Sequence, residues 1–206
     1  QQGKRALVSS RLENLVRRHS FDSFTSYLAM ISRNRSGVDF SEFIDTLTTN
    51  HTGFWRGPDH YTFFIKSVLP DHPSRIRVWS AACSTGEEPY TLGMCAQGAG
   101  LQNCRVVASD ISRRVLHAAM LGKYETQRLR DLPPGWTDRF FTADKAGSRQ
   151  VIPALRAMVD FGPLNILEPF SHLGTFDVIF CRNVMTYFAQ GTRDQLVARL
   201  AARLVP

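Results

Sequence analysis

Polar side chains follow four short apolar runs in the second part of this sequence. Glu88 comes after the first run and its loop, and Asp110 ends the second. Asn165 follows the third run, while Arg182 and Asn183 follow the fourth. If the runs are parallel strands, their carboxyl ends meet at one edge, where open α/β sheets bind ligands. Any one of these residues could simply order a loop, but their recurrence at four exits predicts a ligand site.

The loop after the first run indicates the charge of the ligand. It consists of small residues, Ala82-Cys83-Ser84-Thr85-Gly86, which let a ligand approach the backbone, and it leads into Glu87 and Glu88. A phosphate-binding loop would offer bare amides and often a lysine, and the Gly-x-Gly-x-x-Gly pattern is missing. Asp110 lies about 20 residues further on, where a carboxylate can bind ribose hydroxyls, although it could equally cap the next helix. These residues predict an adenosyl ligand with cationic groups in place of phosphates.

Alternating strands and helices must position these side chains. The strand-length runs are Arg75–Ala81, Cys104–Asp110, Met158–Leu164 and Phe176–Arg182. Helical stretches cover about Glu87–Gln97, Arg113–Leu121 and Arg193–Leu204. This alternation predicts a parallel, doubly wound α/β sheet. The stretch between Gly122 and Arg156 has few periodic signals and is expected to be irregular, with short helices or a loop over the site.

The first 70 residues follow a different pattern. Apolar residues recur there at helical spacing, and no alternating β-branched run occurs. Asp22 and Asp39 occupy helix N-cap positions, and Pro58 suits the first turn of a fourth helix. We therefore expect an all-helical domain over residues 1–70, a hinge near residues 70–73, and the α/β domain over residues 71–206.

Composition narrows the class of partner. The 206 residues carry a formal net charge of +7, and 43% of them are hydrophobic, which suffices for a folded core. A basic surplus attracts nucleic acid, membrane surfaces or acidic proteins. The four cysteines form no Cys-x-x-Cys pair and do not stand at zinc-ligand spacing from the histidines, so no metal is expected. The sequence has neither a signal-peptide pattern nor an apolar run near the roughly 20 residues of a membrane span, so a cytoplasmic location without membrane insertion is expected.

Four blocks of the sequence, in matching order and spacing, resemble those of CheR-type chemotaxis methyltransferases. The blocks are Thr48–Arg56, Ser80–Tyr90, Ala108–Ile111 and Phe176–Phe188. The resemblance spans nearly the whole chain and implies a small helical domain followed by a Rossmann-like (class I methyltransferase) domain. It also implies that S-adenosyl-L-methionine donates a methyl group to glutamate side chains on cytoplasmic helices of methyl-accepting chemotaxis-type receptors, with S-adenosyl-L-homocysteine as the product.

The resemblance also implies which residues contact the cofactor. By motif match they are Asn50, Thr52, Arg56, Glu88, Asp110, Asn165, Ile166, Arg182 and Asn183. Arg56 and Tyr187 would lie nearest the transferred methyl group. A glutamate carboxylate is ionised near neutral pH, so no general base is needed, and catalysis depends on alignment and desolvation. Arg56 is expected to orient a carboxylate of cofactor or substrate, and Tyr187 to position the attacking oxygen.

Two departures from the family concern the pocket and the C-terminal side. Trp55 fills a variable place in the first block and is expected to reshape the pocket wall. The sheet is expected to be incomplete, because the family's domain continues with further strands after Pro206. The small β-subdomain that some members use to grip a receptor tail is also expected beyond that residue.

A basic helical face is the candidate for receptor docking. Up to Arg35 the chain has seven basic residues against two acidic ones, and Lys4, Arg11 and Arg18 recur every seven residues. Receptor methylation helices are acidic and could dock there, although a charge run is equally often a solvated face.

Two other functions remain open. A nucleic-acid methyltransferase would suit the charge, but an adenine-amino enzyme needs an Asn/Asp-Pro-Pro-aromatic block where this chain has Arg182–Met185. A cytosine-carbon enzyme needs a cysteine after proline, whereas Cys181 follows Phe180. Nucleic acid is therefore not the expected partner. The second possibility is a module that binds S-adenosylmethionine and regulates a partner without catalysis.

Overall fold

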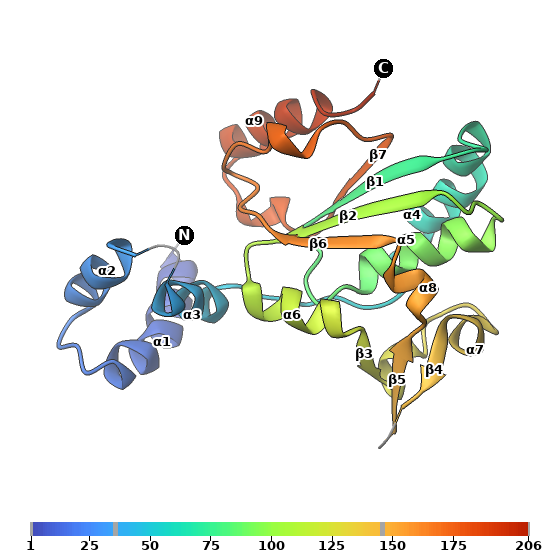
Figure 1. Cartoon of the computed structure of the whole chain (residues 1–206). Coiled ribbons are helices and arrows are strands. Elements are labelled where there is room, and N and C mark those ends of the chain that lie inside the picture. Colours follow the sequence, from blue (N-terminus) through green and yellow to red (C-terminus); the bar gives the residue numbers. More distant parts are fainter. Residues whose placement is uncertain (1, 35–36, 145–146, 206) are drawn as a thin grey trace. The chain divides into compact units, whose positions relative to one another are not determined.

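The computed structural model describes residues 2–34, 37–144 and 147–205 and divides into two compact units (Figure 1). One unit comprises residues 1–50 with 112–114, and the other comprises residues 51–111 and 115–206. The division falls at Asn50 rather than near residue 70. The reason is that Tyr61, Phe64 and Leu69 are buried in the core of the second unit, so their helical segment belongs to the α/β fold.

The first unit is a small helical one. Its helices are α1 (Gln2–Arg18), α2 (Phe24–Ser32) and α3 (Val38–Leu47). Leu15, Tyr27 and Ile31 form the centre of its core, which is the expected result of helices with one apolar stripe. The α2 helix begins after Ser23, whose side-chain oxygen accepts a hydrogen bond from the Ser26 amide at 3.2 Å.

A four-stranded parallel sheet forms the centre of the second unit. Its strands are β1 (Ile76–Ala81), β2 (Cys104–Asp110), β6 (Val159–Pro163) and β7 (Val178–Cys181). The order is β6-β2-β1-β7, with every neighbouring pair parallel. The four predicted strands and their parallel arrangement are confirmed. The strand order reverses between β1 and β7, which makes the carboxyl ends of these two strands the switch point where such sheets bind ligands.

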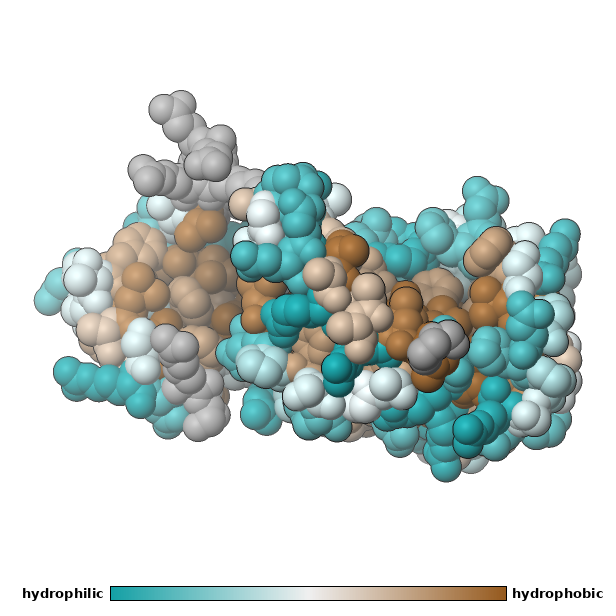
Figure 2. All heavy atoms as spheres, turned by 90° about the horizontal axis from the view of Figure 1, so that it is seen from above, coloured by the Kyte–Doolittle hydropathy of each residue, from teal (hydrophilic) through white to brown (hydrophobic). Residues whose placement is uncertain are grey.

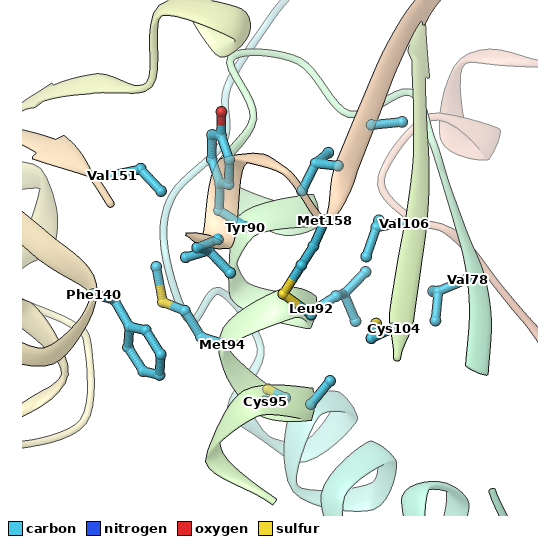
Figure 3. Packing of buried hydrophobic residues seen from close by; sticks show 14 of the residues in the cluster. Val78, Tyr90, Leu92, Met94, Cys95, Cys104, Val106, Phe140, Val151 and Met158 are labelled. Carbon is cyan, nitrogen blue, oxygen red and sulfur yellow. The ribbon is translucent and has the colours of Figure 1, made fainter. Parts of the chain in front are cut away.

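Helices cover both faces of this sheet because side chains alternate along each strand. Val78, Val106 and Phe180 belong to one buried cluster together with residues of α5 (Glu87–Gly98). Figure 3 shows Leu92 of α5 beside the side chains of β1 and β2, whereas Phe140 and Val151 lie on the other side of the same helix. The opposite face of the sheet packs against α9 (Gln190–Ala201) through a second cluster. The remaining helical segments of the sheet core are α4 (Pro58–Phe63), a π-helical turn (Phe64–Val68), a 3-10 turn (Leu69–Asp71), α6 (Arg113–Leu121) and two further 3-10 turns (Ser171–Leu173 and Met185–Tyr187).

The stretch expected to be irregular contains a second, small sheet. Its strands are β3 (Lys123–Glu125), β4 (Phe141–Ala143) and β5 (Ser148–Val151), and they pair antiparallel in the order β3-β5-β4. The accompanying helical segments are a 3-10 turn (Thr126–Leu129), α7 (Trp136–Phe140) and α8 (Pro153–Arg156). The strands are too short to produce a clear alternation, which is why the pattern did not reveal them. A small antiparallel sheet therefore lies inside the chain, although the family's β-subdomain was expected only beyond Pro206.

The surface gives no further assignment. The face drawn in Figure 2 carries hydrophobic residues among hydrophilic ones, as the surfaces of most folded proteins do. Within the described ranges, no helix combines the length and the apolar character that crossing a membrane requires.

Candidate functional site

The register of the parallel sheet brings the four strand ends level. One row across it, from β6 to β7, contains Gly162, Ser109, Ala81 and Cys181. Asp110 and Arg182 each follow this row by one residue, and Asn165 and Asn183 stand in the loops that continue from it. The polar residues singled out at the four exits therefore come from one edge of the sheet.

Arg182 connects three elements at the switch point. Its Nη1 atom donates to Glu88 Oε2 at 3.1 Å and to the Tyr61 hydroxyl at 3.2 Å, and its Nη2 atom donates to the backbone carbonyl of Arg56. The guanidinium carbon also lies 5.4 Å from the centre of the Tyr61 ring. Arg182 thus joins the exit of β7 to the start of α5 and to the loop before α4.

Glu88 is almost withdrawn from solvent at the start of α5. The side chains of Glu88 and Arg182 are 14% and 15% exposed, and Ser80 of β1 donates its hydroxyl to Glu88 Oε1 at 2.8 Å. Burial raises the pKa of Glu88, while Ser80 and Arg182 act in the opposite direction. Both carboxylate oxygens of Glu88 accept hydrogen bonds from neighbouring side chains. Glu88 therefore holds these side chains in place as well as adding negative charge to the site.

Glu87 points to a different partner. Its side chain is fully buried, and it accepts hydrogen bonds from Arg128 and from the Thr85 hydroxyl, the latter at 2.7 Å. Burial raises the pKa of Glu87, and Arg128 lowers it. The two acidic residues at the start of α5 are therefore each paired with an arginine. Their charge argues less strongly against phosphate than the sequence suggested.

Asp110 holds the loop after β1 in place. The Ser84 amide donates to Asp110 Oδ2 at 2.8 Å, and the neighbouring Ala82 and Ser84 have φ angles of 64° and 50°. Residues other than glycine rarely adopt such angles, and they do so most often where function constrains the backbone. Burial raises the pKa of the Cys83 thiol, and the charges of Asp110 and Glu88 raise it further. Asp110 and Glu88 thus act on the same thiol of this loop.

Gly86 ends this loop for a packing reason. Its φ angle is +93°, and a Cβ atom there would lie 2.8 Å from Ala119 Cβ and 2.9 Å from the Tyr124 hydroxyl. The missing side chain therefore admits α6 and β3, whereas the sequence had suggested close approach of a ligand at this point.

The exits of β6 and β7 are ordered by local bonds. Asn165 Oδ1 accepts a hydrogen bond from the Leu167 amide at 3.1 Å, and its Nδ2 donates to Glu168 at 3.3 Å. Ile166 is buried against the α9 side of the sheet. Asn183 adopts a left-handed φ of 62°, which asparagine tolerates better than most residues, and Tyr187 is 56% exposed. These four residues follow the last two strands of the sheet in sequence, and they are not among the hydrogen-bond partners of Arg182, which are Tyr61, Glu88 and the Arg56 carbonyl.

Thr52 and Arg56 line a pocket of about 710 Å³ on the second unit. Two segments form its walls, residues 51–58 and residues 127–131. Arg56 donates from Nη1 to the His51 carbonyl at 2.8 Å, and its own carbonyl accepts from Arg182. Asn50 belongs to the first unit, where its amide nitrogen lies 3.2 Å from the Thr48 hydroxyl.

Sequence reasoning missed three partners of the charged residues at the site, which are Tyr61 beside Arg182, Ser80 beside Glu88, and Arg128 beside Glu87. Tyr61 lies in the predicted fourth helix, Ser80 lies in the first predicted strand and begins the block Ser80–Tyr90, and Arg128 lies in the stretch expected to be irregular. None of the three was predicted as a site residue. Neither helical nor strand periodicity relates Ser80 to Glu88, because a loop separates the strand that carries Ser80 from the helix that carries Glu88. The available signal for such partners was a glutamate at the start of an apolar helix, because a carboxylate that is buried there requires a charged or hydrogen-bonding partner.

The sequence matches two family descriptions. Residues 50–206 match the "CheR methyltransferase, SAM binding domain", and residues 1–48 match the "CheR methyltransferase, all-alpha domain". The "Chemotaxis protein methyltransferase" of Escherichia coli is 38% identical over 214 residues, which cover 98% of this chain and 73% of that protein. The protein of the same name from Borreliella burgdorferi is 35% identical over 215 residues, covering 98% and 76%. "Chemotaxis protein methyltransferase 2" of Pseudomonas aeruginosa is 38% identical over 215 residues, covering 100% and 76%.

The parallel sheet, the polar residues at its carboxyl edge and the match to a SAM-binding domain define an S-adenosylmethionine-dependent methyltransferase. The match extends over both compact units. The chain belongs to the CheR methyltransferase family.

Proposed function

We propose that this enzyme forms methyl esters on glutamate side chains of methyl-accepting chemotaxis-type receptors. The names of its relatives support chemotaxis as the process. The proposal includes a cytoplasmic site of action, because the substrate glutamates of such receptors are expected on cytoplasmic helices. The observation that carries it is the Arg182 network, which joins the loop bearing Arg56 to the cofactor edge of the sheet.

The residues at the edge fit an adenosyl cofactor. Asp110 offers a carboxylate at the end of β2, where ribose hydroxyls are commonly bound. Ala82 and Ser84 have left-handed φ angles in the loop after β1, and the Cys83 amide of this loop donates to the Ser109 carbonyl of β2 at 2.9 Å. We assign cofactor contacts to Asn50, Thr52, Arg56, Glu88, Asp110, Asn165, Ile166, Arg182 and Asn183.

The methyl transfer itself needs alignment more than acid-base chemistry. When bound, S-adenosylmethionine supplies a methyl group made electrophilic by its sulfonium sulfur. The substrate carboxylate is already ionised, so its oxygen can attack in line without a base. Arg56 orients a carboxylate through paired N–H donors, and Tyr187 positions the attacking oxygen.

The proposal is tested with labelled S-adenosylmethionine and a soluble cytoplasmic fragment of a methyl-accepting receptor. Label that mild base releases marks an ester on a carboxylate. Label that resists base indicates transfer to nitrogen or carbon, as a nucleic-acid enzyme would perform. Cofactor binding without transfer to the fragment would favour the regulatory module instead.

A further inference from the structure

We infer that the pocket between residues 51–58 and 127–131 binds acidic residues that flank the methylated glutamate of the substrate. This inference rests on the proposed function, because it assigns a substrate subsite to the same enzyme. The pocket belongs entirely to the second compact unit and has a volume of about 710 Å³.

Both walls of the pocket are fixed to the cofactor edge of the sheet. The carbonyl of Arg56 on one wall accepts a hydrogen bond from Arg182, which also holds Glu88. Arg128 on the other wall donates to the buried Glu87 and, at 3.3 Å, to the Thr85 hydroxyl. A ligand between these walls therefore lies against the two segments that frame the start of α5.

The charges of the pocket favour an anionic ligand. Arg128 and Arg130 line it together with Arg56, which the proposed function assigns to the reacting carboxylate, against Asp131 as the acidic lining residue. Glu87 offsets the charge of Arg128 from behind. The pair of Arg130 and Asp131 is 3.9 Å apart with side chains 80% and 70% exposed, so this pair is weak and its arginine is available to another carboxylate.

An aromatic surface completes the pocket. Trp55 lines it with a left-handed φ of 55°. Its ring stacks on Tyr61 at 5.1 Å and meets the edge of Trp136 at 5.1 Å, so the indole is held from two sides. A rigid ring beside guanidinium groups can pack against the aliphatic stem of a glutamate side chain while the carboxylate meets a guanidinium group.

Charge variants at the exposed pair test this inference. Arg130→Glu should raise the KM for the receptor fragment by about five- to twenty-fold, while kcat and the Kd for S-adenosylmethionine stay unchanged. Asp131→Asn should lower the same KM, because it removes the opposing carboxylate. Arg75→Glu is the matched control. It makes the same charge change at an exposed residue before β1, at the opposite end of the sheet.

The measurement is the initial rate of base-labile methyl transfer as a function of fragment concentration, at low and high salt. Added salt should raise the wild-type KM more than that of Arg130→Glu, because salt screens exposed charge. Equal KM values for Arg130→Glu and Arg75→Glu would overturn the inference while leaving the methylation intact. If the wild type transfers no methyl ester, the proposed function fails. In that case the fluorescence anisotropy of a labelled receptor fragment measures its binding to the three variants. The subsite is supported if Asp131→Asn binds the fragment most tightly, Arg75→Glu less tightly and Arg130→Glu least tightly.

Discussion

Arg182 and Glu88 form an ion pair between the exit of β7 and the first turn of α5, with 3.1 Å between Nη1 and Oε2. Both side chains are largely buried, and the pair spans the point where the strand order reverses. The same guanidinium holds Tyr61 and the Arg56 carbonyl. The loop that carries Arg56 and the carboxyl edge of the sheet therefore share one support.

Removing both partners of this pair should destabilise the fold by less than the sum of the two single losses. Glu88→Leu or Arg182→Met alone leaves a buried charge unpaired and should cost about 3–5 kcal/mol. The double variant Glu88→Leu/Arg182→Met should cost less than the sum of the two, with a coupling of about 1–3 kcal/mol. Urea unfolding of all four proteins measures the cycle. Additive losses would mean that the two groups do not support each other.

We expect a side chain at Gly57 to collide with Arg182, so the requirement for glycine there does not come from the backbone angle alone. Its φ is +72°, and a Cβ atom there would lie 2.6 Å from Arg182 Nη2. Gly57→Ala should therefore lose stability and also weaken binding of S-adenosylmethionine. The control is Gly100→Ala, where φ is +83° but no atom lies within 4 Å of the added Cβ.

Gly100→Ala should carry only the strain of a left-handed residue, about 1–2 kcal/mol. Isothermal titration with S-adenosylmethionine and urea unfolding compare the two variants. A cofactor affinity for Gly57→Ala equal to that of Gly100→Ala would remove Arg182 from the explanation.

Glu87 should give stability a distinctive dependence on pH. Burial raises its pKa in the folded state above the ordinary 4.5, so the folded protein binds the proton more tightly than the unfolded chain does. Its contribution to stability therefore increases as the pH falls from above the raised value toward 4.5. As the pH falls through this window, the unfolding free energy of the wild type should rise relative to that of Glu87→Gln. A difference that shrinks toward pH 4.5 would contradict the direction of the shift.

The strands of the main sheet were predictable because their apolar runs are long and lie between clear helices. Cys104–Asp110 was predicted with the bounds that β2 has. The antiparallel sheet was not predictable, since β3 and β4 have three residues each and cannot show a period. The division of the units at Asn50 was missed for a related reason. Helical spacing identifies α4, but only packing shows which core buries Tyr61.

Side-chain pairing at the site was the least predictable part. The sequence places Glu87 and Glu88 together, yet a helix turns successive residues by about 100°, and the two carboxylates meet different arginines. The basic face of α1 shows the same limit. Arg18 binds Glu42 at 2.7 Å and Arg11 binds the Leu47 carbonyl at 3.0 Å, while the Lys4 side chain lies outside what the structure describes. Two of the three predicted docking charges thus have partners within their own unit.

Kinetics of Arg56 and Tyr187 variants test the proposed alignment of the reacting groups. Arg56→Ala should lower kcat/KM for the receptor fragment by about 100-fold, because misorientation of the reacting carboxylate affects the transition state. Arg56→Lys should recover little of this loss, since an ammonium group lacks the paired donors of a guanidinium. Tyr187 is 56% exposed, so Tyr187→Phe should fold normally, lower kcat about 10-fold and leave the Kd for S-adenosylmethionine unchanged. Rates of base-labile methyl transfer give these constants, with Arg75→Ala as the control. Full turnover by Arg56→Ala would exclude the arginine from the reaction, and an unchanged kcat for Tyr187→Phe would exclude the hydroxyl.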